Sequence, residues 1–95
     1  MAEHPSPKDI VALDPRFRLQ WEEAQNAYVL LYPEGMVQLN DAAGEILSHC
    51  DGVRTVTDIV DKVSESFPED DVTADIREFL QSAIANGWIR VTSDQ

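Results

Sequence analysis

The chain has 95 residues, 43% of them hydrophobic, and a formal net charge of −11 from 18 acidic and 7 basic side chains. This length predicts one domain with one modest core. The acidic surface argues against nucleic acid and anionic membrane as main partners, because it would repel their phosphates. No apolar run is long enough for a membrane helix, and no basic start and apolar stretch mark a signal peptide, so a cytoplasmic protein is expected.

The first residues carry no hydrophobic periodicity. Residues 1–12 include Pro5 and Pro7 and are expected to form a flexible N-terminal arm. Residues 13–91 are then a single domain, and residues 92–95 a C-terminal tail.

Three strands are expected after the Asp14-Pro15 turn signal. Apolar and polar residues alternate over residues 17–22, which predicts a strand with one buried face. Residues 28–32 are a continuous apolar run, typical of a central strand. Pro33-Glu34-Gly35 predicts a tight reversal, and residues 36–39 form the third strand. Its Val37 and Leu39 share one face, since side chains alternate along a strand.

A first helix should follow the third strand. Asn40 or Asp41 can cap it, because their side-chain oxygens can accept the free amide hydrogens of the first turn. Gly44 weakens it by about 1 kcal/mol relative to alanine, and Gly52 is expected to end it with a left-handed conformation. Its apolar stripe consists of Ala43, Ile46, Leu47 and Cys50.

A second helix is predicted from Thr55, with Asp58 three residues later in a spacing like that of a capping box. Pro68 should stop this helix. Its apolar positions follow the helical repeat and are Val56, Ile59, Val60, Val63 and Phe67.

A third helix should be capped by Asp70 or Asp71, whose charge suits the positive end of the helix dipole. Asn86-Gly87 ends it. Residues 88–91 follow as a short last strand or as an extended tail packed on the core. The apolar arc of this helix is wide for one neighbour and consists of Val72, Ile76, Phe79, Leu80, Ala83 and Ile84.

The order of elements predicts an α+β fold. A three-stranded antiparallel sheet is followed by three helices and a possible short C-terminal strand. This arrangement is winged-helix-like, an analogy of architecture that does not settle function.

Groups for catalysis are scarce. His49 and Cys50 are sequence neighbours, which point about 100° apart on a helix and do not face each other. A structural role for both is expected, with Cys50 buried. The acidic run 69–71 lacks the spacing of a calcium loop, and the chain has no CxxC, HxxxH or phosphate-binding glycine loop. We therefore expect no enzyme activity, no metal and no cofactor.

The third strand offers a binding edge instead. In a three-stranded meander an outer strand carries unpaired amides and carbonyls that an extended peptide can complete. Residues 36–39 contain no proline or lysine, two residues that commonly block such an edge. If the third helix lies beside this strand, its extra apolar arc would floor a groove for the peptide.

Several short blocks stand out along the chain. They are RLQWE at 18–22 with the preceding Phe17, LLYPEGM at 30–36, Leu39-Asn40, Ile46-Leu47, Asp51-Gly52 and Gly87-Trp88-Ile89. Together and in this order they resemble the PqqD family, the small protein of pyrroloquinoline quinone biosynthesis. The similarity covers about residues 13–91. Ala42 stands where the family commonly has threonine, and Gly44 where it commonly has alanine.

The resemblance implies a peptide chaperone rather than an enzyme. Proteins of this family are stand-alone precursor-recognition domains that bind the ribosomally made peptide PqqA. They present it to PqqE, a radical S-adenosylmethionine enzyme that cross-links a glutamate and a tyrosine of the peptide. In related recognition domains the leader peptide adds to the third strand and lies against the third helix.

Carried onto this chain, the resemblance implies a peptide-binding site with two sides. The edge would be Met36, Val37, Gln38 and Leu39. Arg77, at the margin of the third helix, could pair with an acidic residue of the peptide. The wall would come from Ile76, Phe79, Leu80, Ala83 and Ile84, some facing the peptide and some the core.

Two other functions fit a small α+β domain less well. In a winged-helix nucleic-acid binder the third helix would read the nucleic acid, but it carries Asp71, Asp75 and Glu78 against Arg77 alone. A carrier protein would need an Asp-Ser dipeptide for its prosthetic group, and none occurs. An open edge and a loose arm could also pair with a second copy as a homodimer.

Overall fold

The structure is a computed structural model, which describes residues 5–92. Six strands and three helices follow one another within these residues. They are β1 (Ile10–Leu13), β2 (Arg18–Glu22), β3 (Ala27–Tyr32), β4 (Gly35–Gln38), α1 (Asp41–Ser48), β5 (Asp51–Thr55), α2 (Val56–Glu65), α3 (Thr73–Ala85) and β6 (Ile89–Val91).

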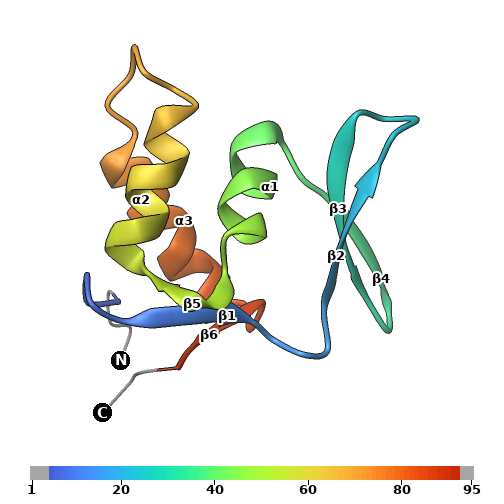
Figure 1. Cartoon of the computed structure of the whole chain (residues 1–95). Helices are drawn as coiled ribbons and strands as arrows, with labels where there is room; N and C mark the ends of the chain where they lie inside the picture. Colours follow the sequence, from blue (N-terminus) through green and yellow to red (C-terminus); the bar gives the residue numbers. More distant parts are fainter. Residues whose placement is uncertain (1–4, 93–95) are drawn as a thin grey trace.

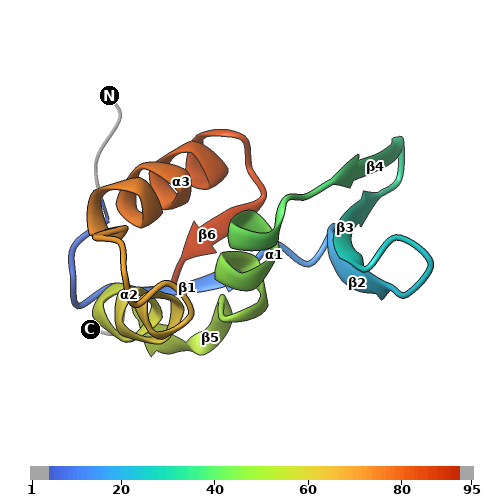
Figure 2. The same ribbon diagram turned by 90° about the horizontal axis from the view of Figure 1, so that it is seen from above.

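The strands form two separate antiparallel sheets of three strands each, in the orders β5-β1-β6 and β2-β3-β4. Figure 1 shows α2 and α3 above the first sheet, with α1 between this pair and the second sheet. The view from above in Figure 2 agrees, since the β2-β3-β4 sheet projects to one side of α1. The second sheet is therefore a wing attached beside a helical body.

The wing confirms the expected strand meander. Leu19 lies opposite Leu30, which lies opposite Val37, so three apolar side chains cross one face of the sheet. Leu30 is fully buried. This face meets α1, which explains why the apolar alternation of residues 17–22 indicated a half-buried strand.

The prediction of a flexible arm over residues 1–12 is wrong for residues 10–12. Residues 10–12 belong to β1, which is the central strand of its sheet, and Val11 is fully buried. The backbone carbonyl of Pro7 also accepts a hydrogen bond from the amide of Thr57. Both partner strands of β1 lie far along the chain, so local patterning gives no sign of the sheet. Residues 1–4 of the arm and residues 93–95 of the tail lie outside the described residues.

The end of α1 also differs from expectation. Asn40 caps its start by accepting from the amide of Ala43, as predicted, but the helix ends at Ser48 with His49 as its C-cap. Gly52 has the expected positive φ of 82°, yet it lies in β5 rather than at the helix end. The pairing of β5 with β1 is irregular at this point, which is where a left-handed residue fits a bulge.

The termini of α2 and α3 follow different rules. Thr55 and Asp58 form the complete capping box that the sequence predicts for α2. Neither Asp70 nor Asp71 is the N-cap of α3. Val72 holds that position without a side-chain bond, and the carboxylate of Asp71 accepts from the amide of Thr73 at 3.3 Å.

The C-terminal end of α3 is as predicted. Gly87 has a φ of 79°, and its amide donates to the carbonyl of Ile84. The amide of Trp88 donates to the carbonyl of Ala83, which completes a Schellman motif. The chain then turns into β6, so residues 89–91 are a strand rather than a packed tail.

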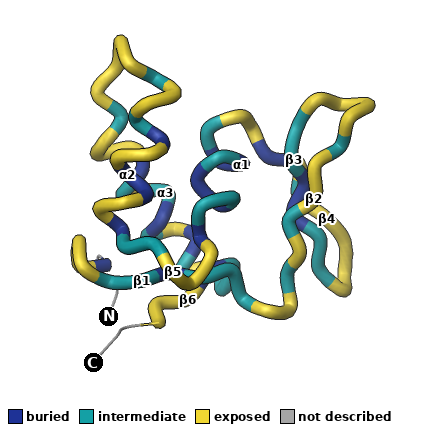
Figure 3. Tube along the Cα trace, viewed as in Figure 1, coloured by how far each residue is buried: buried dark blue, intermediate teal, exposed yellow. Residues whose placement is uncertain are grey.

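The core lies where the three helices meet β1, β3 and β6, and the buried segments of the tube in Figure 3 converge there. The α+β, winged-helix-like class is confirmed, with an additional sheet that includes the expected short C-terminal strand. The largest fully buried side chains are Leu30, Ile59, Ile76, Leu80 and Ile89, with Val11, Val29, Val56 and Val63.

Candidate functional site

Strand β4 is an outer strand of the wing. Within residues 5–92 it pairs only with β3. Met36 is 57% exposed and Gln38 is also exposed, whereas Val37 is half-buried and Leu39 is buried. The side chains of Val37 and Leu39 therefore anchor β4 to the protein, and the other two face outward.

The backbone of β4 presents free hydrogen-bonding groups in a defined register. The amide of Leu39 donates to the carbonyl of Tyr28, so Leu39 and, by alternation, Val37 direct their polar groups toward β3. Met36 and Gln38 occupy the intervening positions, where amide and carbonyl point away from β3. These two residues offer the open edge that an added strand would need.

The six α3 residues of the predicted site divide by burial. Ile76, Leu80 and Ala83 are buried at 2%, 0% and 0% exposure, so they are core residues first. A second group is half-buried and consists of Arg77, Phe79 and Ile84. Leu80 and Ala83 offer no surface to a partner in this conformation.

Two members of the predicted wall line a hollow. A largely apolar hollow of about 280 Å³ opens between α1 and α3, and we call it the α1–α3 hollow. Ile76 and Phe79 from the predicted set lie in its lining. The remaining lining residues are Asn40, Ala42, Ala43, Ile46, Val63, Phe67, Val72 and Asp75.

The position of the α1–α3 hollow connects it to the edge of β4. Asn40, which lines the hollow, follows two residues after the end of β4. The chain therefore passes within two residues from the end of β4 to the lining of the hollow. Sequence reasoning missed the α1 and α2 residues of its lining, because their helical spacing marks a core face and does not show where the core opens.

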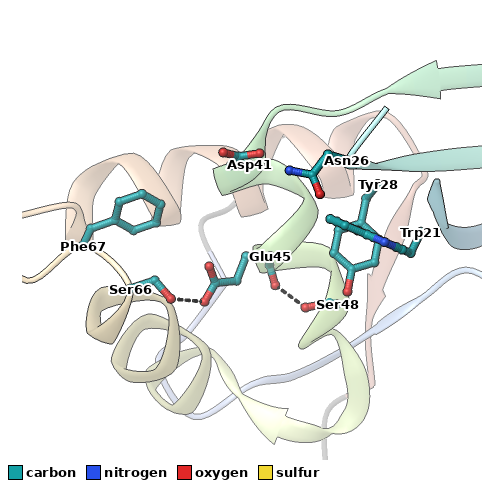
Figure 4. A pocket seen from close by; sticks show the side chains of 8 residues that line it. All are labelled: Trp21, Asn26, Tyr28, Asp41, Glu45, Ser48, Ser66 and Phe67. Atoms are coloured by element: carbon teal, nitrogen blue, oxygen red, sulfur yellow. Dashed lines mark hydrogen bonds between the residues drawn. The ribbon is translucent and has the colours of Figure 1, made fainter. Parts of the chain in front are cut away.

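A second and larger hollow, of about 520 Å³, lies between the wing, α1 and the end of α2. We call it the wing hollow. Figure 4 shows its eight lining side chains, with the aromatic rings of Trp21 and Tyr28 at one end and Phe67 at the other. The complete lining is Trp21, Asn26, Tyr28, Asp41, Glu45, Ser48, Ser66 and Phe67.

Polar contacts tie the walls of the wing hollow together. The hydroxyl of Ser66, after α2, donates to the Glu45 carboxylate on α1 at 2.6 Å, and Glu45 lies 4.0 Å from the His49 ring. Trp21 belongs to the apolar alternation of residues 17–22, which predicted a buried strand face, but it is 46% exposed. No feature of the sequence indicates this exposure.

The neighbours His49 and Cys50 do not form a catalytic pair in the structure; Cys50 has a structural role. Cys50 is buried, and its thiol donates to the carbonyl of Ile46 at 3.3 Å. Burial, with a smaller effect of the Asp51 charge, raises the pKa of the thiol to about 12. Such a thiol is protonated at neutral pH and is a poor nucleophile.

Two carboxyl groups have lowered pKa values because they accept hydrogen bonds that stabilise turns. Hydrogen bonds from Arg16 lower the pKa of Asp14, and bonds from the amides of Val53 and Arg54 outweigh burial to lower that of Asp51. Both carboxylates organise turns. Among residues 5–92 no group of three or more potential metal ligands lies together. No helix in this part of the chain is both long and apolar enough to span a bilayer.

Comparison with known proteins places these features in a family. The family described as coenzyme PQQ synthesis protein D (PqqD) matches residues 27–89. A protein of Methylococcus capsulatus named PqqA binding protein is 50% identical over 84 residues, covering 88% of this chain and 90% of its own. A protein of the same name from Azotobacter vinelandii is 51% identical over 84 residues, covering 87% and 91%.

A solved structure shares the fold. It is the solution structure of the PqqD truncation of Methylobacterium extorquens PqqCD, described as a functional, stand-alone recognition element for ribosomally made, modified peptides. It superposes with a TM-score of 0.71 at 30% identity and covers 90% of this chain and 93% of its own. The chain therefore belongs to the PqqD family of coenzyme PQQ synthesis proteins.

Proposed function

We propose that this protein is a peptide-binding adaptor of PQQ biosynthesis, which holds the precursor peptide PqqA as an additional strand on β4. The observation that carries the proposal is the outward-facing backbone of Met36 and Gln38 beside an apolar hollow. The names of its relatives, PqqA binding protein and a recognition element for modified peptides, support the same partner.

The edge and the hollow would have separate tasks. Amides and carbonyls of an added strand bond to Met36 and Gln38 whatever the peptide sequence, which supplies affinity. Specificity would come from apolar side chains of the peptide that enter the α1–α3 hollow against Ile76 and Phe79. Asp75 lines the same hollow, and Arg77 lies half-buried on α3, so both charges could select the peptide's own charged residues.

The remaining steps of the proposed role concern the partner enzyme. The adaptor performs no chemistry of its own and presents the bound peptide to the radical S-adenosylmethionine enzyme PqqE. Because a ribosomal peptide is made in the cytoplasm, the complex would form there. A peptide that pairs with β4 along one of its edges would leave its opposite edge free for the enzyme.

A proline substitution on β4 tests the edge directly. Gln38→Pro removes an outward amide and places a ring on the edge, while the bonds between β3 and β4 use other residues. Gln38→Ala is the matched control, because it removes the side chain and keeps the amide. We expect precursor peptide to bind Gln38→Pro at least about tenfold more weakly than Gln38→Ala, the loss of one to two hydrogen bonds.

Amide chemical shifts of the labelled protein locate the peptide in the same titration. Shifts centred on residues 36–39 and on Phe79 are expected. Equal affinity of the two Gln38 variants, or shifts confined to other elements, would refute the proposed site. Light scattering of protein, peptide and enzyme together then tests presentation, which requires a ternary complex.

A further inference from the structure

The wing hollow is separate from the proposed peptide site. Asp41, Glu45 and Ser48 line it from one face of α1, at positions i, i+4 and i+7. The α1–α3 hollow is lined instead by Ala42, Ala43 and Ile46, which lie on another face of the same helix. Apart from Phe67, no residue lines both hollows.

The aromatic end of the wing hollow leaves much of an indole side chain exposed. Trp21 and Tyr28 lie on paired positions of β2 and β3, with ring centroids 5.1 Å apart in an edge-to-face arrangement. Trp21 remains 46% exposed although it borders the wing's buried face. Among aromatic side chains, the indole of tryptophan attracts cations most strongly.

The floor of the wing hollow is acidic. The carboxylates of Asp41 and Glu45 lie one helical turn apart, and none of the eight lining residues is lysine or arginine. Glu45 uses one oxygen to accept from Ser66. A cation in this hollow would meet two carboxylates and an aromatic face in a cavity large enough for a long side chain.

We propose that the wing hollow binds an arginine side chain from a basic segment of a protein partner, and that this binding is compatible with a peptide held on β4. The chemistry matches the net charge of −11, which attracts a basic partner over longer distances. The two hollows lie on different faces of α1, so both can be filled. Binding of the basic side chain in the wing hollow does not require a peptide on β4.

Titration with a capped hexa-arginine peptide tests the wing hollow. The indole NH signals of Trp21 and Trp88 are followed by NMR and assigned with Trp88→Phe. We expect the Trp21 indole and the amides of residues 41–48 to shift, and the Trp88 indole to stay in place. Shifts of both indoles alike, or none at Trp21, would overturn the assignment.

A charge-matched pair of variants separates local recognition from general attraction. Asp41→Asn with Glu45→Gln removes both carboxylates of the hollow and retains an acceptor for Ser66. Asp61→Asn with Glu78→Gln removes two exposed charges that line neither hollow. The first variant should bind hexa-arginine at least about tenfold more weakly than the second. If both variants bound hexa-arginine equally weakly, the binding would depend on net charge alone, which would refute the site.

Two further ligands decide the kind of partner. Precursor peptide should bind the Asp41/Glu45 variant as tightly as the unchanged protein, and a matching loss would show that the wing hollow belongs to the peptide site. Spermine should bind at least about tenfold more weakly than hexa-arginine, since it lacks the planar guanidinium that stacks on an indole. Spermine binding as tight as that of the peptide would make the hollow a polyamine site instead.

Discussion

Gly44 determines how closely α1 approaches the wing. A Cβ atom at this position would lie 2.7 Å from Cδ2 and 3.0 Å from Cβ of Tyr28, closer than carbon atoms pack. The Tyr28 ring in turn contacts Trp21. Glycine therefore has a packing role at this position, which the sequence pattern registers only as poor helix propensity.

We expect Gly44→Ala to lower the free energy of unfolding by about 1 kcal/mol. Overpacking of a tight contact costs about 1–3 kcal/mol, and the gain in helix propensity returns up to about 1 kcal/mol. Urea unfolding measures the change. In a Tyr28→Leu background the same substitution should become neutral or stabilising; a loss of equal size there would show that Tyr28 is not the cause.

Cys50 makes stability depend on pH at the alkaline end. Its pKa rises from 9.0 in the ordinary thiol to about 12 on burial. Unfolding therefore releases a proton only above pH 9, and the stabilisation from the buried thiol is lost as the pH rises from 9 toward 12. Unfolding of the protein and of Cys50→Ala at pH 8, 10 and 11 measures this effect. The stability difference between them should shrink with rising pH; a constant difference would contradict the assignment.

At the scale of elements, the ends of the helices are stabilised unequally. Helix α2 begins with both bonds of a capping box, whereas α3 begins at Val72 with no side-chain cap. The start of α3 lies at the α1–α3 hollow, since the N-cap residue Val72 lines it. The apolar Val72 side chain therefore lines the hollow and makes no capping bond to the helix.

Thr55→Ala should lower the free energy of unfolding by about 1 kcal/mol, because it removes the acceptor for the amide of Asp58. Thr55→Ser keeps a hydroxyl at the same place and should restore most of the loss. Thermal or urea unfolding of the three proteins provides the measurement. A serine variant as unstable as the alanine variant would assign the effect to the methyl group of threonine.

Elements with local signals were predicted well, and elements defined by distant partners were not. The turn at residues 33–35 and the capping box at Thr55 lie within a few residues of what they organise, so sequence reasoning found them. The paired residues of β1 and β5, Ala12 with Asp51 and Ile10 with Thr55, lie 39 and 45 positions apart in the sequence, and both runs are too short to show alternation. The same limit applies to the candidate site, since residues 36–39 were identified as an edge but the exposure of Trp21 was not.

At the scale of the whole molecule, β1 joins the chain's beginning to its end. It separates β5 from β6 and supplies Val11 to the core. The carbonyl of Cys50 also accepts from the amide of Leu13, and that of Trp88 from the amide of Asp14. The N-terminal segment is therefore part of the domain from Ile10 onward.

Val11→Ala is expected to lower the free energy of unfolding by about 2 kcal/mol, since it removes two fully buried methyl groups and leaves a cavity. Val53→Ala is the control, because that side chain is 75% exposed in the neighbouring strand and should change stability by less than about 0.5 kcal/mol. Urea unfolding compares the two. Similar small losses would mean that β1 is only loosely held.

The pairing of β1 with β6 has a practical consequence for linking this domain to other chains. The amide of Thr92 donates to the carbonyl of Ile10, so the first and last strands run side by side, and Figure 2 shows β1 and β6 on the other side of α1 from β4. A fluorophore, surface tether or second domain attached next to the outer end of β1 or β6 would leave the β4 edge unobstructed. The solved relative is itself a truncation of a longer chain named PqqCD, and such a geometry is what a covalently joined recognition domain requires.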